Sequence, residues 1–375
     1  MKYVFHLVAI PNSQSTRAYS LCGYSQATIR MCRMLKDLGH KVYLYASEEN
    51  EAPCDELVTV ITKAEQAEHL EGVPYQYGMM ADKRGLFVTS VPRTIMEINK
   101  RKQPKDFLLI YGWTHSRLIA EKHSDMPAVE FHIGSTHSGA SFRVFSSSAW
   151  QYLNYGQEKR WNGRHFDTMI PGFFDPAEFT FRDHKEPFAL YVGRLIQKKG
   201  VPMACAAAKL AGLPLQVIGH GNHTLVTDGA EYLGALPADE RNDWMSRAQV
   251  LICPTQYIEA FGNIVVEAAM CGTPSVSSDW GGFSETVEHG RTGYRCSYLE
   301  EYAQALKDCA NLDHAYIRQR AIEKYSLQAV GQQYQRYFDR IYRIWDHGIG
   351  EYMIQTPALT TPPTSDADGS SKASG

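Results

Sequence analysis

Three features are missing from this sequence of 375 residues. No apolar run reaches the roughly 18 residues that a bilayer crossing needs. The apolar opening, residues 2–10, is short, is broken by His6 and lacks a small-residue cleavage site, so it predicts a buried strand rather than a signal peptide. The eight cysteines form no Cys-x-x-Cys pair, which favours reduced thiols of an intracellular protein. An excess of one charge is also missing, since 38 Lys and Arg face 41 Asp and Glu.

Net charge therefore calls for neither nucleic acid nor an anionic membrane as a partner. We expect a cytoplasmic protein, with peripheral membrane contact left open. Nothing in the sequence sets its oligomeric state.

The length predicts two domains, because a domain typically takes about 100 to 200 residues. Apolar runs in the first half alternate with helical periodicity, which is typical of a parallel sheet flanked by helices. The expected strands are residues 2–10, 42–45, 57–61, 107–111 and 128–132. The pattern breaks in the proline- and charge-rich segment 171–187, where we place the linker.

Four further strands are expected in the second half, at residues 188–192, 215–218, 250–253 and 275–277. Each ends in a loop rich in glycine or charge. Because parallel strands deliver their carboxyl ends to one edge, these four loops predict a ligand site there. The domains are thus predicted as 1–178 and 179–330, followed by a helix over 331–352 and a disordered tail over 353–375.

The run from Glu259 to Glu267 holds two carboxylates around an expected helix start at Phe261-Gly262-Asn263. Glu267 falls among apolar residues, where a carboxylate is either a paired core group or a ligand for ribose hydroxyls. Glu259 precedes the helix and is placed to hold a sugar hydroxyl, while the free amides of residues 261–264 donate to others.

Arg194 and Lys199 lie five positions apart, across a strand end and a helix start. Two cations beside free helix amides suit a diphosphate, although two solvated cations are the alternative. Gly23 follows the first strand, where doubly wound domains bind phosphate, but one glycine before a helix is also an ordinary turn.

Together these segments resemble the retaining glycosyltransferases of family 4, the glycosyl transferases group 1. The resemblance covers about residues 191–293 and rests on three motifs in order: Gly193-Arg194 to Lys199-Gly200, Glu259 to Glu267, and Gly281-Gly282-Phe-Ser-Glu285. It implies a GT-B fold, in which two Rossmann-like domains face each other across a cleft. It also implies that the last helix crosses back to the first domain.

The resemblance further implies roles for individual residues. Arg194 and Lys199 would bind the diphosphate of a nucleotide-sugar donor, Glu267 the ribose, and Glu259 the transferred sugar. The amides of Phe261, Gly262, Asn263 and Ile264 would assist Glu259. Gly23 would contact the distal phosphate, although Cys22-Gly23 replaces the usual paired glycines. His132 would touch the sugar near the reacting carbon, with His137 as a second choice and a core or surface histidine as the alternative.

The implied function is transfer of a hexose-like sugar from a UDP- or GDP-linked donor to a hydroxyl, with retention and without a metal or other cofactor. Retaining glycosidases use two carboxyls about 5 Å apart, one as nucleophile, and no such nucleophile is identified here. The only Asp-x-Asp is Asp366-Ala-Asp368 in the tail. The alternatives are a catalytically silent sugar-nucleotide-binding subunit, and a phosphorylase or epimerase on the same fold.

The acceptor stays open between a glycan, a lipid, a small molecule and, less favoured, nucleic acid. It is expected against the first domain. The basic run 99–105 is one candidate contact, with a solvated helix end as the alternative. The segment 134–148, which includes Arg143, is a second candidate.

Overall fold

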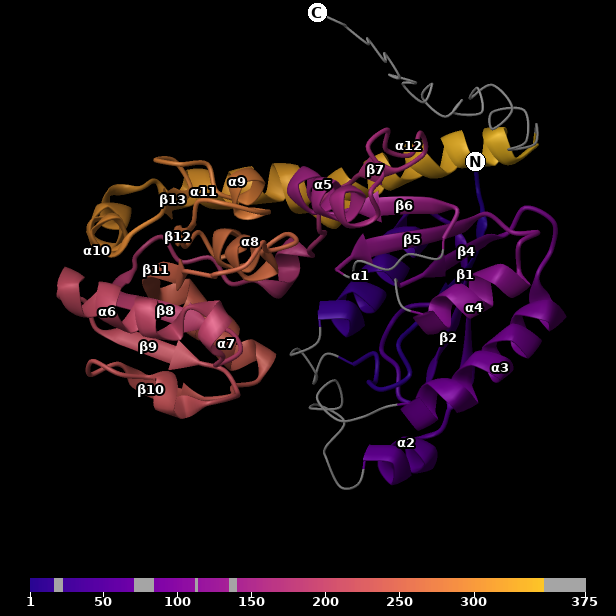
Figure 1. Ribbon diagram of the computed structural model, residues 1–375, viewed down its shortest axis with the longest axis horizontal. Coiled ribbons are helices and arrows are strands. Elements are labelled where there is room, and N and C mark those ends of the chain that lie inside the picture. The colour runs from indigo at the N-terminus through magenta and orange to yellow at the C-terminus, as the bar shows by residue number, and fades with distance from the viewer. Residues whose placement is uncertain (17–22, 71–83, 112–113, 135–139, 347–375) are drawn as a thin grey trace, which may run out of the picture.

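The computed structural model describes residues 1–16, 23–70, 84–111, 114–134 and 140–346. These residues form two parallel sheets with helices on their faces, and a long last helix starts beside the second half and extends over the first (Figure 1). The expected tail and His137 lie outside the described residues.

The first sheet has the order β3-β2-β1-β4-β5-β6-β7, and every neighbouring pair is parallel. Its strands are β1 Val4–Val8, β2 Lys41–Ser47, β3 Glu56–Ile61, β4 Phe107–Ile110, β5 Ala128–Ile133, β6 Phe142–Phe145 and β7 Thr168–Met169. Its helices are α1 Gly23–Asp37, α2 Lys63–Leu70, α3 Arg84–Arg101, α4 Thr114–Lys122 and α5 Ser148–Gln157.

The second sheet has the order β10-β9-β8-β11-β12-β13 and is also parallel throughout. Its strands are β8 Glu186–Val192, β9 Leu215–Ile218, β10 Glu231–Gly234, β11 Ala248–Cys253, β12 Ser275–Ser278 and β13 Gly293–Cys296. Its helices are α6 Val201–Ala211, α7 Ala238–Arg247, α8 Asn263–Met270, α9 Phe283–Thr286, α10 Leu299–Asp308 and α11 His314–Tyr325. Short 3₁₀ turns occur at Pro176–Glu178, Gln197–Lys199, His223–Leu225 and Cys309–Asn311.

The nine expected strands are present, and all of their ends match within two residues, including the opening strand, which is Val4–Val8 rather than residues 2–10. Four strands were not predicted from the sequence, namely β6, β7, β10 and β13. β7 has only two residues, and charged residues or glycines interrupt the apolar pattern of the other three strands: Arg143 in β6, Glu231 and Gly234 in β10, and Gly293 and Arg295 in β13.

Helix α12, Leu327–Asp346, packs its apolar face on the first sheet's core. Val330, Phe338 and Ile341 are fully buried there, beside Phe5 and Phe107. The helix therefore belongs structurally to the first half although it follows the second in sequence. The residue boundaries 178/179 and 330/331 stay predictions.

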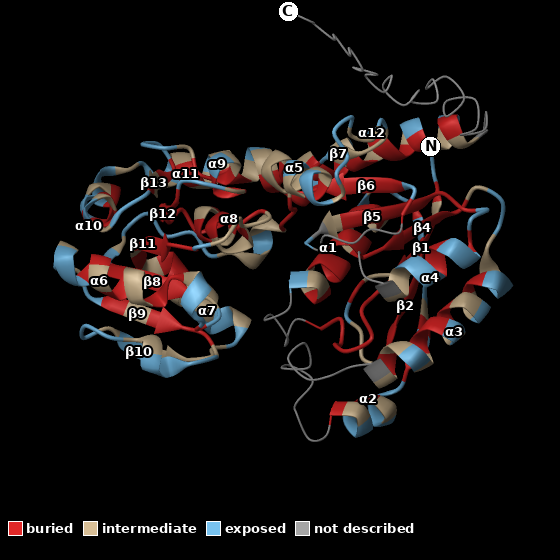
Figure 2. Ribbon diagram, in the orientation of Figure 1, coloured by how far each residue is buried: buried red, intermediate tan, exposed pale blue. Residues whose placement is uncertain are grey.

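Apolar side chains pack on both faces of each sheet. Figure 2 shows most of the strands as buried. The cysteines of the described part are free, and all of them except Cys54 are buried. Within the same residues, no helix combines the length and apolar character needed to cross a bilayer. The cytoplasmic location stays a prediction.

Candidate functional site

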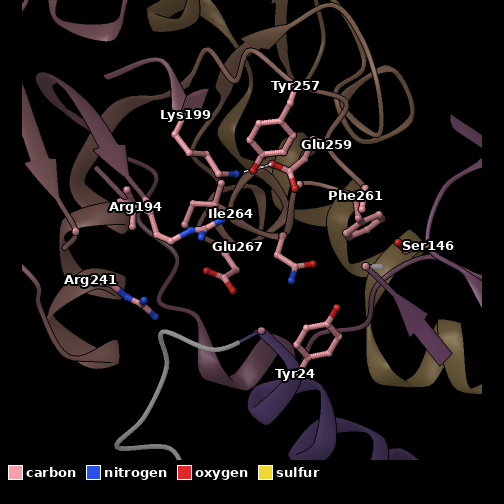
Figure 3. Close-up of a pocket in the computed structure, with 18 of the residues that line it drawn as sticks. Tyr24, Ser146, Arg194, Lys199, Arg241, Tyr257, Glu259, Phe261, Ile264 and Glu267 are labelled. Atoms are coloured by element: carbon pink, nitrogen blue, oxygen red, sulfur yellow. Dashed lines mark hydrogen bonds and ion pairs between the residues drawn. The ribbon is translucent and has the colours of Figure 1, made fainter. Parts of the chain in front are cut away.

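A cavity of about 530 Å³ lies between the two halves of the molecule, at the carboxyl edges of both sheets. All ten predicted site residues line it: Gly23, His132, Arg194, Lys199, Glu259, Phe261, Gly262, Asn263, Ile264 and Glu267. Figure 3 shows the charged members directed toward a common space. The structure therefore brings the candidates together, and their individual roles stay predictions.

The N terminus of α8 faces this cavity because Gly262 allows a sharp turn. Gly262 has φ +89°, and a Cβ atom there would lie 2.6 Å from Cε1 of the Phe283 ring. A larger residue would meet both a disfavoured backbone and a clash. No side chain caps the helix at this end. Val265 already donates to the Gly262 carbonyl at 3.0 Å. The amides of Asn263 and Ile264 at the start of the helix are available to an anion, which the helix dipole also favours.

Lys199 and Glu259 form a close ion pair, with 2.6 Å between Nζ and Oε2. The Tyr257 hydroxyl also donates to this oxygen, at 3.2 Å, and the Lys199 ammonium lies over the Tyr257 ring. Burial disfavours the ammonium, but the Glu259 carboxylate outweighs it and raises the pKa of Lys199. Lys199 therefore stays charged, and Glu259 holds it in place at the cavity wall.

Arg194, Arg241 and Glu267 surround the next part of the cavity (Figure 3). Burial lowers the pKa of Arg241, and the Glu267 carboxylate opposes that shift. The sequence analysis missed Arg241 because it missed strand β10, whose carboxyl end leads into α7. Three cationic side chains and two carboxylates thus line the second-half wall of the described cavity.

His132 lies across the cavity, near the end of β5, and has φ +52°. This is an uncommon backbone conformation for a residue other than glycine, and such outliers cluster at functional sites. Its ring makes edge contacts with Tyr24 and Phe173, at centroid distances of 6.0 and 6.3 Å. Burial, and secondarily the Arg30 charge, lower the pKa of His132 to about 4. The imidazole is therefore neutral near pH 7.

The two halves also bond directly beside the cavity, through the N terminus of α5. The backbone amides of Ser148 and Ala149 donate to the Glu285 carboxylate at 3.2 and 3.1 Å. The Ser147 hydroxyl donates to the carbonyl of Ala260 at 2.6 Å. The Glu285 motif residue thus contacts the opposite half rather than lining the cavity.

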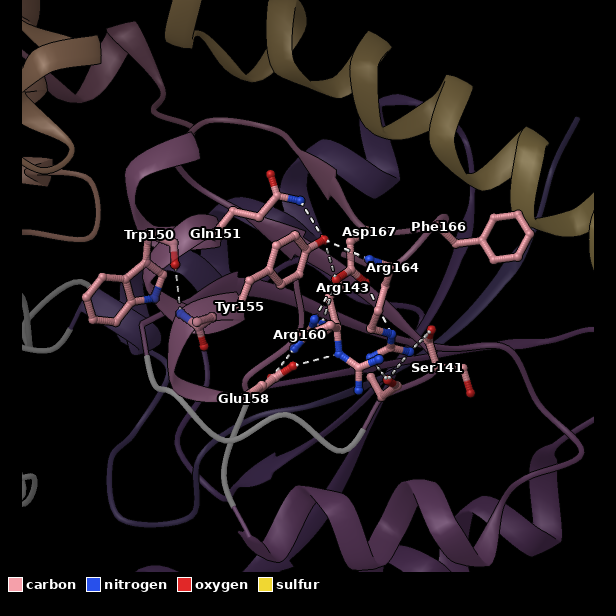
Figure 4. A network of polar contacts seen from close by, with 12 residues as sticks. Ser141, Arg143, Trp150, Gln151, Tyr155, Glu158, Arg160, Arg164, Phe166 and Asp167 are labelled. Carbon is pink, nitrogen blue, oxygen red and sulfur yellow. Dashed lines mark hydrogen bonds and ion pairs between the residues drawn. The ribbon is translucent and has the colours of Figure 1, made fainter. Parts of the chain in front are cut away.

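A buried ion network fixes α5 against β6 and β7 (Figure 4). The Arg143 guanidinium bonds Asp167 at 2.6 and 2.9 Å and Glu158 at 2.5 Å, and Tyr155 donates to Asp167 at 3.0 Å. Within the candidate acceptor segment 134–148, Arg143 does not line the cavity, because this side chain is only 1% exposed and is bonded within the network. Other described residues of the segment 134–148, Gly134 and Ser146, do line the cavity.

Trp150 reaches the same cavity from α5 and was not among the predicted residues. Its buried indole N–H has no hydrogen-bond acceptor within the described part of the chain. Trp150 thus adds an aromatic side chain of α5 to the first-half wall of the cavity.

Comparison with known proteins supports this architecture. Residues 186–311 match the family model for Glycosyl transferases group 1. The chain is 32% identical over 126 residues to the phosphatidyl-myo-inositol mannosyltransferase of Propionibacterium freudenreichii subsp. shermanii, covering 32% of this chain and 33% of that protein. It is 35% identical over 149 residues to the glycogen synthase of Mycobacterium tuberculosis, covering 35% and 36%. The chain thus spans about a third of the length of the curated relatives it matches.

Similarity to solved structures extends over both halves. AviGT4, a glycosyltransferase involved in avilamycin A biosynthesis, superimposes with a TM-score of 0.67 at 20% identity and covers 91% of this chain and 98% of its own. HepE of Anabaena, solved with UDP and glucose, has a TM-score of 0.60 at 15% identity, with coverage of 90% and 100%. The fold is therefore GT-B. Within it, residues 186–311 are a domain of the Glycosyl transferases group 1.

Proposed function

We propose that this protein is a retaining glycosyltransferase that moves a hexose-like sugar from a nucleotide-diphosphate donor to a hydroxyl acceptor without a metal. One observation carries the proposal. A single cavity joins the Lys199–Glu259 pair, Arg194, Glu267 and the open end of α8 to His132 of the opposite half.

The donor diphosphate would lie between Arg194, Lys199 and the amides at the start of α8. Charge-assisted bonds of this kind are about twice as strong as neutral ones. Gly23 lines the same part of the cavity from the first half, because a Cβ atom added to it would lie 3.4 Å from Nδ2 of Asn263. A donor phosphate there would contact the Gly23 amide.

The two carboxylates would bind different parts of the rest of the donor. Glu267, inside α8, would accept the ribose hydroxyls, and Glu259 would accept a hydroxyl of the sugar. Glu259 also holds Lys199, so sugar and diphosphate would be positioned by two members of one ion pair.

Transfer requires a positive charge to develop on the sugar while the diphosphate departs. Cations and helix amides fixed around the leaving group stabilise that charge separation. A neutral His132 would bond the sugar near the reacting carbon without adding positive charge there. Both carboxylates that line the described cavity lie on the second half. We therefore favour attack by the acceptor from the leaving-group face, with its proton passing to the departing phosphate.

UDP is the favoured donor nucleotide, with GDP second. HepE was solved with UDP-glucose and the pneumococcal O-GlcNAc transferase GtfA with UDP and GlcNAc, which supports a uridine donor. The names of the relatives, which include D-inositol 3-phosphate glycosyltransferase and glycogen synthase, support a polyhydroxylated acceptor.

The test is a panel of UDP-, GDP- and ADP-linked hexoses, scored by thermal stabilisation and by slow donor hydrolysis. We expect one nucleotide series to stabilise the protein and to be hydrolysed, with no loss of activity in EDTA. Stabilisation without hydrolysis or transfer would favour the silent subunit. Sugar phosphate released only when inorganic phosphate is added would favour a phosphorylase. NMR of the first-formed product would contradict retention if the anomeric configuration were inverted.

A further inference from the structure

Three arginines lie on one face of α12, away from the candidate site. Arg336, Arg340 and Arg343 are spaced four and three residues apart, which stacks them along a single helical face. All three are exposed. Together with His165, Phe166 and Asp339 they line a groove of about 470 Å³, here called the arginine groove.

These arginines have no carboxylate partner among the described residues, where no ion pair within 4.0 Å involves them. Asp339 shares the groove but is engaged elsewhere. Its Oδ1 accepts from the Tyr3 hydroxyl at 2.5 Å and from Gln335 at 3.0 Å. Like charges at this spacing destabilise a helix slightly. The arginine groove is therefore a local concentration of positive charge on a chain of net charge −3.

The basic run 99–105 behaves in the opposite way. Lys100 pairs with Glu97, Arg101 with Glu56, and Lys102 with Asp125, each at 2.5 to 2.6 Å. Three basic residues of the run that the sequence made a candidate acceptor contact are thus ion-paired within the fold. By contrast, the three arginines of α12 form no ion pair with the described residues, although Arg340 lies 5.2 Å from the centroid of the Tyr337 ring.

Exposed apolar side chains occur on a chain segment that supplies part of the wall of the arginine groove. His165 and Phe166 belong to the connection between α5 and β7, which touches α12 through the Tyr337 hydroxyl and the Phe166 carbonyl at 2.8 Å. In the same connection Trp161 is 86% exposed, and Met169 of β7 is 41% exposed. An exposed tryptophan on a segment that contacts an arginine-bearing helix is typical of a surface that lies at a membrane interface.

We propose that the arginine groove docks this protein on a membrane surface, by binding the phosphate groups of anionic lipids. The arginines supply bidentate donors for phosphate, and the exposed Trp161 enters the headgroup region. This inference is independent of the proposed sugar transfer, since none of its residues lines the donor cavity.

The test uses the full chain and sedimentation with vesicles. Phosphatidylcholine vesicles are compared with vesicles that also contain phosphatidylglycerol. Arg340→Gln/Arg343→Gln is compared with Lys122→Gln/Lys307→Gln, which removes two exposed cations that no described ion pair involves. We expect binding to the anionic vesicles only, weakened about 30-fold in the groove variant, at about 1 kcal/mol per cation. The control variant should bind as the wild type does.

Equal binding by both variants, or no binding by the wild type, would overturn the proposal. So would a ligand other than lipid: a melting temperature raised by inorganic phosphate or by RNA, with no partition onto vesicles, would assign the groove to that ligand instead. Unchanged thermal unfolding of Arg340→Gln/Arg343→Gln ensures that a loss of binding is not a loss of fold.

Discussion

The ammonium of Lys199 lies 2.6 Å from the carboxylate of Glu259. These residues are 60 positions apart and were expected to bind different parts of one donor. Each side chain therefore helps to position the other. Because Glu259 would bind the sugar and Lys199 the diphosphate, we expect substitutions at the two sites to differ in their effects on nucleotide binding and on sugar transfer.

Glu259→Gln should abolish transfer while preserving nucleotide binding. The change removes the carboxylate that would hold the sugar, and it frees Lys199 to bond the diphosphate. We expect transfer or donor hydrolysis to fall about 100-fold or more, with UDP affinity unchanged or tighter by calorimetry. Lys199→Met is the contrasting variant, because it should weaken UDP itself. Equal loss of UDP affinity in both variants would contradict the division of roles.

Glu267→Gln should weaken a nucleoside diphosphate but not pyrophosphate. A lost hydrogen bond to a charged group is worth about 1.5 to 3 kcal/mol, which corresponds to a 10- to 150-fold change in UDP affinity. Pyrophosphate carries no ribose, so its inhibition constant should not move. A change in both ligands would show that Glu267 acts on the cavity as a whole.

Glu285→Ala should loosen the contact between the two halves. The variant removes the carboxylate that accepts from the α5 amides of Ser148 and Ala149. We expect about 1 to 2 kcal/mol of lost stability and a larger radius of gyration by small-angle scattering. Glu301→Ala is the matched control, because Glu301 accepts from the Ser297 amide within one half. A similar radius for Glu285→Ala and wild type would contradict the interpretation.

Asp167→Asn should destabilise the fold strongly. Asp167 and Arg143 are both nearly inaccessible, and removing one partner of such a pair typically costs about 3 to 5 kcal/mol. Chemical denaturation measures this loss. Glu186→Gln, which removes an exposed partner of Arg247, should cost less than about 1 kcal/mol. A small effect at Asp167 would show that the network relaxes around the change.

The free energy of unfolding should decrease as the pH is lowered below 6.5, partly because of His40. The side chain is 2% exposed, its Nδ1 accepts from the Tyr3 amide at 3.1 Å, and burial lowers its pKa to about 4. Between pH 6.5 and 4 the unfolded chain therefore binds a proton that the folded chain rejects, so the free energy of unfolding decreases as pH falls. From pH 7 to 5 this group contributes a loss of about 2 kcal/mol.

His40→Asn tests this contribution, because asparagine keeps an acceptor but does not titrate. Denaturant unfolding at pH 7 and 5 should show a smaller difference for the variant than for the wild type. His132 titrates in the same window and is present in both proteins, so it does not affect the comparison. Identical pH dependence in the two proteins would contradict the assignment.

Sequence periodicity was sufficient for the uninterrupted apolar strands and for α12, because their side chains repeat at the period of the backbone. It failed for β6 and β10, where Arg143, Glu231 and Gly234 interrupt the apolar pattern. Two consequences followed. The candidate acceptor segment 134–148 included Arg143, which is buried in β6, and Arg241 was overlooked although it follows β10.

The sequence by itself determined the family motif, the parallel sheets and the carboxyl edge where Arg194, Lys199, Glu259 and Glu267 gather. Strand direction and glycine-rich loops are local properties, and they fix which loops share an edge. Only the tertiary structure decided which charges are used within the fold and which face solvent. Lys199 meets Glu259, Glu285 caps α5 across the halves, and the run 99–105 is paired while the arginines of α12 are not. Each of these outcomes depends on distances between segments that are remote in sequence. Periodicity and motif spacing carry no information about such distances.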